Sequence, residues 1–170
     1  MNPKAMELSA LVTLLALFPT ASFADARSGG EGTNANVTLD NVCDEGTDIW
    51  EILESEALTT NSNSNCTVTA CSDIANSSVA TTDNDYIFTI AVDDTSPGVN
   101  TSSERSLEMS DNPNVNDPGV WPVCSTRFIA ALPAGAHTIY WLGCRESASD
   151  VSTTVNDSTM AITCSNGNEL

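Results

Sequence analysis

Residues 124–144 read CSTRFIAALPAGAHTIYWLGC and form the longest apolar stretch outside the N-terminus. Two runs typical of β-strands flank the turn sequence LPAG at 132–135. Proline enters a turn with its φ already set, and glycine adopts a positive φ without a steric cost. A three-residue loop at 133–135 fits a type I turn followed by a glycine bulge. We therefore predict that the two halves of this stretch pair as a hairpin.

The register of that hairpin brings its terminal cysteines together. Counting outward from the loop pairs Phe128 with Tyr140 and Cys124 with Cys144. Directly opposed residues on antiparallel strands are close enough for a disulfide, so the turn predicts a bond between Cys124 and Cys144. The same turn also suits a wider arch that crosses between two sheets, and the sequence leaves this alternative open.

The N-terminus has the features of an export signal. A short polar start with Lys4 precedes an apolar run at 8–18, which is too short to cross a bilayer. The sequence SFA at 22–24 fits a small-x-small cleavage site. We expect a signal peptide at 1–24, cleavage near Ala24, and a mature protein that is secreted, either extracellular or periplasmic. No later apolar run is long enough to predict a membrane span.

The composition is strongly acidic. The chain of 170 residues carries 23 Asp and Glu against 5 Lys and Arg, for a net charge of −18. Such a charge repels nucleic acid and anionic lipid, and it suits a saline habitat or the binding of divalent cations. The length predicts one domain. We place it at 37–170, after a Gly- and Asn-rich leader at 25–36 that we expect to be disordered.

The six cysteines all follow the signal segment and predict three disulfides in an oxidising compartment. Residues 66–72 alternate as a strand, so Cys66 and Cys71 point to opposite faces. If this strand lies antiparallel to residues 158–164, Cys66 approaches Cys164. Cys43 is then left to bond with Cys71. The chain has neither a CxxC motif nor a Cys/His cluster, which argues against a zinc or redox site.

The remaining pattern is one of short strands separated by turns. Residues 85–94 form a clear strand whose better core face carries Tyr86, Phe88 and Ile90. A short strand is expected at 105–109, and residues 48–54 suit either one helical turn or a strand. With no internal repeat and no sustained amphipathic helix, the chain predicts an all-β fold: a single antiparallel β-sandwich stapled by disulfides.

The order of three motifs resembles a known group of domains. The strand TVTA at 67–70 is followed by YIFTIAVDD at 86–94 and then by LPAGAHTIYWLG at 132–143. This order resembles secreted jelly-roll domains of the tumour-necrosis-factor and complement type and their bacterial counterparts. The resemblance implies a jelly-roll sandwich in which LPAG turns a corner between two sheets. It also implies action by binding or assembly, often as a homo-oligomeric trimer.

A few residues could carry binding chemistry. Trp121, Trp141 and Arg127 are candidates for a ligand-binding site. The tryptophans can stack on a sugar ring or, alternatively, fill the core, and in the hairpin register Arg127 faces Trp141, which suits a cation–π contact. Oxygen ligands for calcium are offered by four aspartates, although none lies in an EF-hand loop and solvated acidic loops would look the same. These calcium candidates are Asp83, Asp85, Asp93 and Asp94.

Catalytic motifs are weak. His137 is the only histidine and has no nucleophile motif beside it, so we interpret it as structural. The sequence therefore predicts an exported, non-enzymatic module that binds or assembles with a protein or glycan and needs no cofactor other than, at most, calcium. The alternative is a secreted hydrolase that acts on carbohydrate through a pair of carboxylates.

Overall fold

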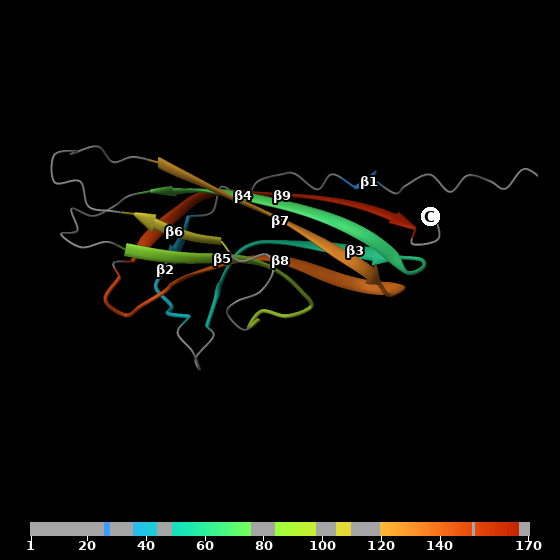
Figure 1. Cartoon of the computed structure of the whole chain (residues 1–170), viewed down its shortest axis with the longest axis horizontal. Helices are drawn as coiled ribbons and strands as arrows, with labels where there is room; N and C mark the ends of the chain where they lie inside the picture. Colours follow the sequence, from blue (N-terminus) through green and yellow to red (C-terminus); the bar gives the residue numbers. More distant parts are fainter. Residues whose placement is uncertain are drawn as a thin grey trace, which may run out of the picture.

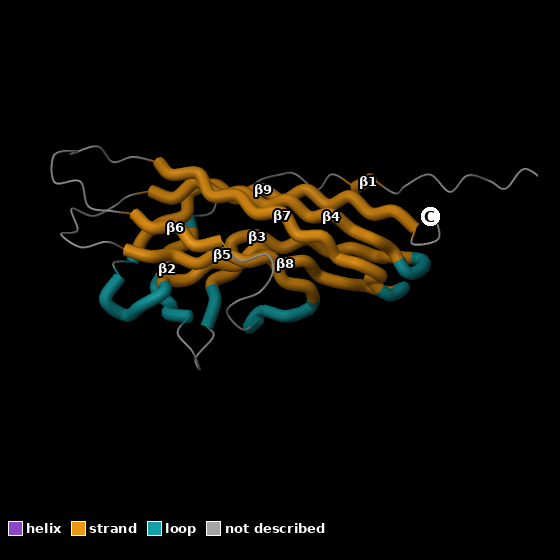
Figure 2. The backbone as a smooth tube through the Cα atoms, in the orientation of Figure 1, coloured by secondary structure: helices purple, strands orange, loops and turns teal. Residues whose placement is uncertain are grey.

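The computed structural model describes residues 26–27, 36–43, 49–75, 84–97, 105–109, 120–150 and 152–166. The expected signal peptide and most of the expected leader lie outside these ranges. Every regular element within them is a β-strand (Figure 2). Accordingly, no helix of the described residues has the length and apolar character to cross a membrane.

The described residues form nine strands in two antiparallel sheets packed face to face, which appear as the upper and lower layers of Figure 1. The strands are β1 (Ala26–Arg27), β2 (Val37–Leu39), β3 (Glu51–Thr60), β4 (Ser64–Ala75), β5 (Asn84–Val92), β6 (Arg105–Met109), β7 (Val120–Leu132), β8 (Gly135–Arg145) and β9 (Thr153–Asn166). Sheet A has the order β9–β4–β7, with β1 and β2 both paired to the other side of β9. Sheet B has the order β3–β8–β5–β6.

The strand order is that of a jelly roll, since β2, β9, β4 and β7 face β3, β8, β5 and β6. The predicted all-β, disulfide-stapled sandwich is therefore confirmed. The ambiguous segment at 48–54 contributes to β3, and the short strand expected at 105–109 is β6. A strand suits the first of these because tertiary pairing with β8 outweighs a weak local helical pattern.

The main core lies between the sheets and is lined by alternate residues of each strand. Its largest buried side chains are Trp141, Tyr86 and Phe88, and the rings of Phe88 and Trp141 stack at 5.7 Å. Tyr86, Phe88 and Ile90 belong to this core, as predicted. The opposite face of β5 is buried as well, because a second apolar cluster covers the outer side of sheet B.

The turn at 132–135 joins the two sheets, so the predicted hairpin is wrong. β7 pairs with β4 in sheet A, whereas β8 pairs with β3 and β5 in sheet B. Ala131 has a φ of 51° and Gly135 a φ of 146°, which redirect the chain on both sides of Pro133. A local turn signal cannot specify whether its flanking strands pair with each other. Here burial against distant strands decides, and the corner implied by the jelly-roll resemblance is present.

The disulfides follow from this arrangement. The predicted bond between Cys66 and Cys164 is confirmed, at a Cα–Cα distance of 4.1 Å. The bonds predicted between Cys124 and Cys144 and between Cys43 and Cys71 are wrong. Cys71 instead joins Cys124 within sheet A, and Cys43 joins Cys144 on sheet B. Because β7 and β8 lie in different sheets, Cys124 and Cys144 are never opposed.

Strand β4 is therefore bonded covalently to both of its neighbours. Cys66 points into the core and joins β9, while Cys71 points outward and joins β7. Their opposite directions were predicted from their odd spacing and are confirmed.

Candidate binding surface

The outer face of sheet A carries an uncharged patch, which we call the neutral face. It consists of three positions on each of the neighbouring strands β7, β4 and β9. The three rows are Phe128, Thr67 and Thr163; Thr126, Thr69 and Ala161; and Cys124, Cys71 and Thr159. All these side chains are exposed except Cys71, which is half-buried. In a chain with a net charge of −18, nine adjoining outward positions without a carboxylate stand out.

The neutral face results from the two-residue period of its strands. Val68, Ala70 and Ile162 point inward and are buried, so the intervening residues must point outward. Threonine is well suited to those outward positions, because its β-branched side chain favours a strand and its hydroxyl tolerates water. Thr69 and Thr126 share a hydrogen bond of 3.1 Å across β4 and β7, which fixes two of the hydroxyls.

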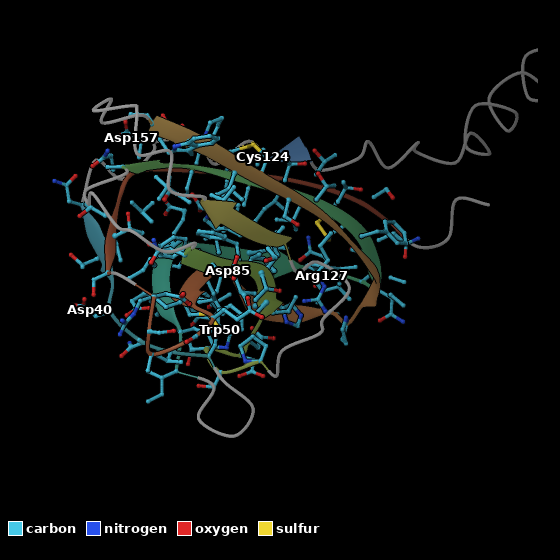
Figure 3. All side chains as sticks on the ribbon, turned by 60° about the vertical axis from the view of Figure 1, so that its left-hand side comes forward. Asp40, Trp50, Asp85, Cys124, Arg127 and Asp157 are labelled. Atoms are coloured by element: carbon cyan, nitrogen blue, oxygen red, sulfur yellow. A yellow bond between two sulfur atoms is a disulfide. The ribbon has the colours of Figure 1, made fainter. Side chains whose placement is uncertain are left out.

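Acidic residues mark the end of the neutral face. In the next row Asp73 lies opposite Asp157 on β9 and Pro122 on β7. Figure 3 places Cys124, on the neutral face, and Trp50, beside sheet B, on opposite sides of the molecule, with Asp157 near one end. The neutral face carries one large exposed apolar side chain, Phe128, which is 64% exposed.

The three residues predicted to bind a ligand have different environments. Trp141 is fully buried, and its Nε1 donates a hydrogen bond of 2.7 Å to Ser72 Oγ, which also bonds with Ser158 Oγ. Trp141 therefore links the two sheets inside the core. Arg127 reaches across to sheet B, where its guanidinium donates to the carbonyl of Ile90 at 2.5 Å. Of the three, Trp121 is the exposed one, at 47%.

The calcium candidates are engaged within the protein or lie outside the described residues. Asp83 falls in the latter group. Asp93 accepts hydrogen bonds from the backbone of Thr138 and from His137, and Asp94 accepts one from Ser96 N at 2.9 Å. Asp85 lies in β5 and is half-buried. In the part of the chain that the structure describes, no three His, Cys, Asp or Glu side chains gather as a metal site would require.

His137 lies at the corner between the sheets. Its Nδ1 is 2.7 Å from Asp93 Oδ2, and its Nε2 is 3.0 Å from the carbonyl oxygen of Pro133. Both ring nitrogens face acceptors, and only the protonated imidazolium can donate to both. The hydrogen bond with Asp93 accordingly raises the pKa of His137, and the same bond lowers the pKa of Asp93. This arrangement supports the interpretation of His137 as a structural residue.

Glu51 is a carboxylate of the described residues with an unusual environment that the sequence analysis did not name as a site. Its Oε1 accepts hydrogen bonds from the backbone amides of Asp40 and Asn41, at 3.0 and 2.7 Å. Its Oε2 is buried without a hydrogen-bond partner in the described structure. Burial raises the pKa of Glu51, although the two amides oppose that effect. These contacts attach β3 to the segment after β2, and no sequence motif predicts them.

Comparison with known proteins adds no family to this description. No protein-family model matches the chain, and a search of the curated proteins finds no match. The resemblance to tumour-necrosis-factor and complement-type domains therefore stays a prediction that rests on the three quoted motifs.

Proposed function

We propose that this protein is an exported, non-enzymatic β-sandwich module that works by binding or assembly, and that the neutral face is its contact surface. The observation that carries the proposal is the absence of charge from that face in a chain of net charge −18. Charged residues are depleted from the centres of protein interfaces, because a carboxylate loses its hydration there. The partner that this surface suits is an uncharged protein or glycan surface.

The rigidity of the neutral face supports the same function. The bond between Cys71 and Cys124 lies on the face itself, and the bond between Cys66 and Cys164 lies directly beneath it. A surface that is ordered before contact loses less conformational entropy on binding. The three disulfides also indicate an oxidising compartment, which agrees with the export proposed from the signal peptide at 1–24.

The hydrolase alternative lacks a specific supporting observation. It needs two carboxylates that flank a sugar. Glu51 has a raised pKa, but the partners of its Oε1 are backbone amides, and the carboxylate of Asp93 is paired with His137. A non-enzymatic role therefore remains the proposal that the geometry favours.

A matched pair of charge substitutions tests the proposed function. Thr69→Asp places a carboxylate at the centre of the neutral face, and Thr59→Asp places the same group on an exposed position of β3. The measurements are light scattering for self-association and co-sedimentation with cellulose and chitin powders. We expect the unaltered protein to show one of these activities, Thr69→Asp to lose it, and Thr59→Asp to keep it.

Two outcomes would contradict the proposal. The first is a monomer that sediments with neither powder, and the second is an activity that Thr69→Asp leaves unchanged. Release of reducing sugar from soluble glucans would instead favour the hydrolase.

A further inference from the structure

Strand β7 has one free edge. Its 13 residues pair with β4 on one side, and no strand of the described residues pairs with the other side. The Cα atoms of Cys71 and Cys124 are 4.1 Å apart, which is the short spacing of a non-hydrogen-bonded antiparallel pair. The N–H and C=O of Cys124 therefore point away from β4. By the two-residue period, those of Thr126 and Phe128 do too.

The free edge of β7 differs from the other sheet edges in length and charge. Natural sheets protect their edges with charged side chains or by keeping the edge strand short. β3, the long edge of sheet B, carries Glu51, Glu54 and Glu56, and the opposite edge strand β6 has only 5 residues. On the far side of sheet A, β1 and β2 have 2 and 3 residues. β7 has no Asp or Glu. Its protective features are Pro122, near its start, and Arg127, whose guanidinium turns inward to the carbonyl of Ile90.

Exposed apolar side chains add to this contrast. Val120, Trp121 and Phe128 are large, exposed and carried by β7. A long edge without carboxylates and with exposed aromatic residues is suited to receive an additional strand from another chain. The arrangement on β7 therefore indicates pairing rather than permanent exposure to water.

We infer that two copies of this chain pair through β7, antiparallel and across a two-fold axis, so that sheet A continues from one copy into the other. This inference rests on the proposed function and names the partner as a second copy. Two chains that each carry −18 repel one another, and β7 with the neutral face is where they can meet without opposing carboxylates. A two-fold axis makes the same edge serve both copies.

Among pairings centred on a residue whose N–H and C=O point away from β4, the edge favours one register. With Thr126 opposite Thr126 of the second copy, Cys124 lies opposite Phe128, and each of these pairs exchanges two backbone hydrogen bonds. Centring the pairing on Cys124 would place Thr126 opposite Pro122, which has no N–H to donate. Centring it on Phe128 would use the end of β7, where Ala131 has a φ of 51° and leaves the strand conformation.

The side chains support the Thr126-centred register. Phe128, which is 64% exposed in one copy, would cover the disulfide of Cys71 and Cys124 in the other copy. Contact between sulfur and an aromatic ring is favourable. The two neutral faces would then form one continuous surface across the joined sheets.

The test is the molar mass in solution, measured by light scattering at about 0.15 M and about 1 M salt, since salt screens the repulsion between the copies. Thr126→Pro removes an N–H that points away from β4, so it blocks the edge and leaves the β4 pairing in place. Thr59→Asp is the matched control, because it adds a carboxylate on β3 of sheet B, outside the neutral face. Thr163→Glu charges the neutral face on β9, two strands away from the edge, and so separates edge pairing from contact between faces. Near-ultraviolet circular dichroism checks the fold, and Phe128→Asp replaces Thr126→Pro if that variant does not fold.

We expect a dimer that is favoured by salt, is lost in the edge variant and is kept in Thr59→Asp. A dimer that only Thr163→Glu disrupts would overturn the edge pairing and uphold the proposed function through contact between faces. A dimer that persists in the edge variant and in Thr163→Glu, or a trimer, would also overturn the two-fold pairing. A monomer at both salt concentrations would overturn it as well, and co-sedimentation with cellulose or chitin would then decide the proposed function separately.

Discussion

The outer face of sheet B is covered by its own chain, whereas the outer face of sheet A is exposed in the described residues. Over sheet B, Trp50 and Cys43 cover Ile87 and Leu142, and the indole of Trp50 donates a hydrogen bond of 2.8 Å to the carbonyl of Pro97. Over sheet A, five of the nine outward positions of the neutral face carry threonine. The difference shows that the apolar outward residues of sheet B are covered, while the threonines of sheet A leave a face that is stable in water and available for contact.

The largest expected effect is the loss of folding stability when an outward-facing disulfide is removed, and it should be greater for the bond over sheet B than for the bond on the neutral face. Removing the bond over sheet B, with Cys43→Ala and Cys144→Ala, should lower the free energy of unfolding by about 4.7 kcal/mol from chain entropy alone. The bond on the neutral face closes a shorter loop, with a separation of 53 residues against 101. Cys71→Ala with Cys124→Ala should therefore lower it by about 4.2 kcal/mol.

Burial widens that difference, because Cys43 and Cys144 are buried and anchor the cover, while Cys124 is exposed. Urea denaturation of both double variants, with the unaltered protein as reference, measures the two losses. If the double variant that lacks the Cys71–Cys124 bond is less stable than the one that lacks the Cys43–Cys144 bond, the assignment of a structural cover to sheet B alone is contradicted.

The next effect concerns two tryptophans. Trp50→Ala should lower the free energy of unfolding by about 3–5 kcal/mol, because Trp50 is 6% exposed within the cover. Trp121→Ala is the matched control on β7. It should change stability by about 0.5 kcal/mol or less, since Trp121 is 47% exposed. Thermal or urea unfolding measures both, and equal losses would show that β7 needs Trp121 as much as sheet B needs its cover.

The smallest effect lies at the corner that joins the two sheets. The pKa of His137 is raised in the folded protein, so its contribution to stability is full below about pH 6.5 and is lost as pH rises through the raised pKa. The pKa of Asp93 is lowered, so its contribution is full above about pH 3.8 and is lost as pH falls through the lowered pKa. The pair should therefore stabilise the corner most between these two values.

His137 is the only histidine, so a proton NMR titration reads its pKa without ambiguity. Asp93→Asn should bring that pKa back toward 6.5 and flatten the loss of stability above it. Asparagine is the suitable replacement because residue 93 has a φ of 54°, which asparagine tolerates. An unchanged histidine pKa in the variant would show that Asp93 does not hold the imidazolium.

Features that depend on local pattern were predictable from the sequence. The two-residue alternation around Cys66 and Cys71 correctly placed them on opposite faces. The assumption that the strand at 66–72 lies antiparallel to 158–164 correctly predicted the bond between Cys66 and Cys164. The strand at 85–94 was predicted with its core face. In each case the identity of neighbouring residues determines the outcome.

Features that depend on which strands meet across the sandwich were not predictable. The turn at 132–135 has the same local chemistry in a hairpin and in a corner, so the pairing of Cys124 with Cys144 was wrong. The neutral face was also missed, because its rows come from three strands that are distant in sequence. The burial of Trp141 against Ser72 could not be predicted for the same reason, because it depends on the stacking of the two sheets.

The two disulfides of β4 also determine how the molecule would respond to a pulling force. Antiparallel strands separate easily when their ladder is unzipped one hydrogen bond at a time, but the ladder between β9 and β4 is interrupted by a covalent link at Cys66, and that between β4 and β7 by one at Cys71. Tension applied at β7 would pass through sulfur bridges to β4 and then to β9. These three strands should remain one mechanical unit until the bridges are reduced, which gives the contact surface a fixed shape under load.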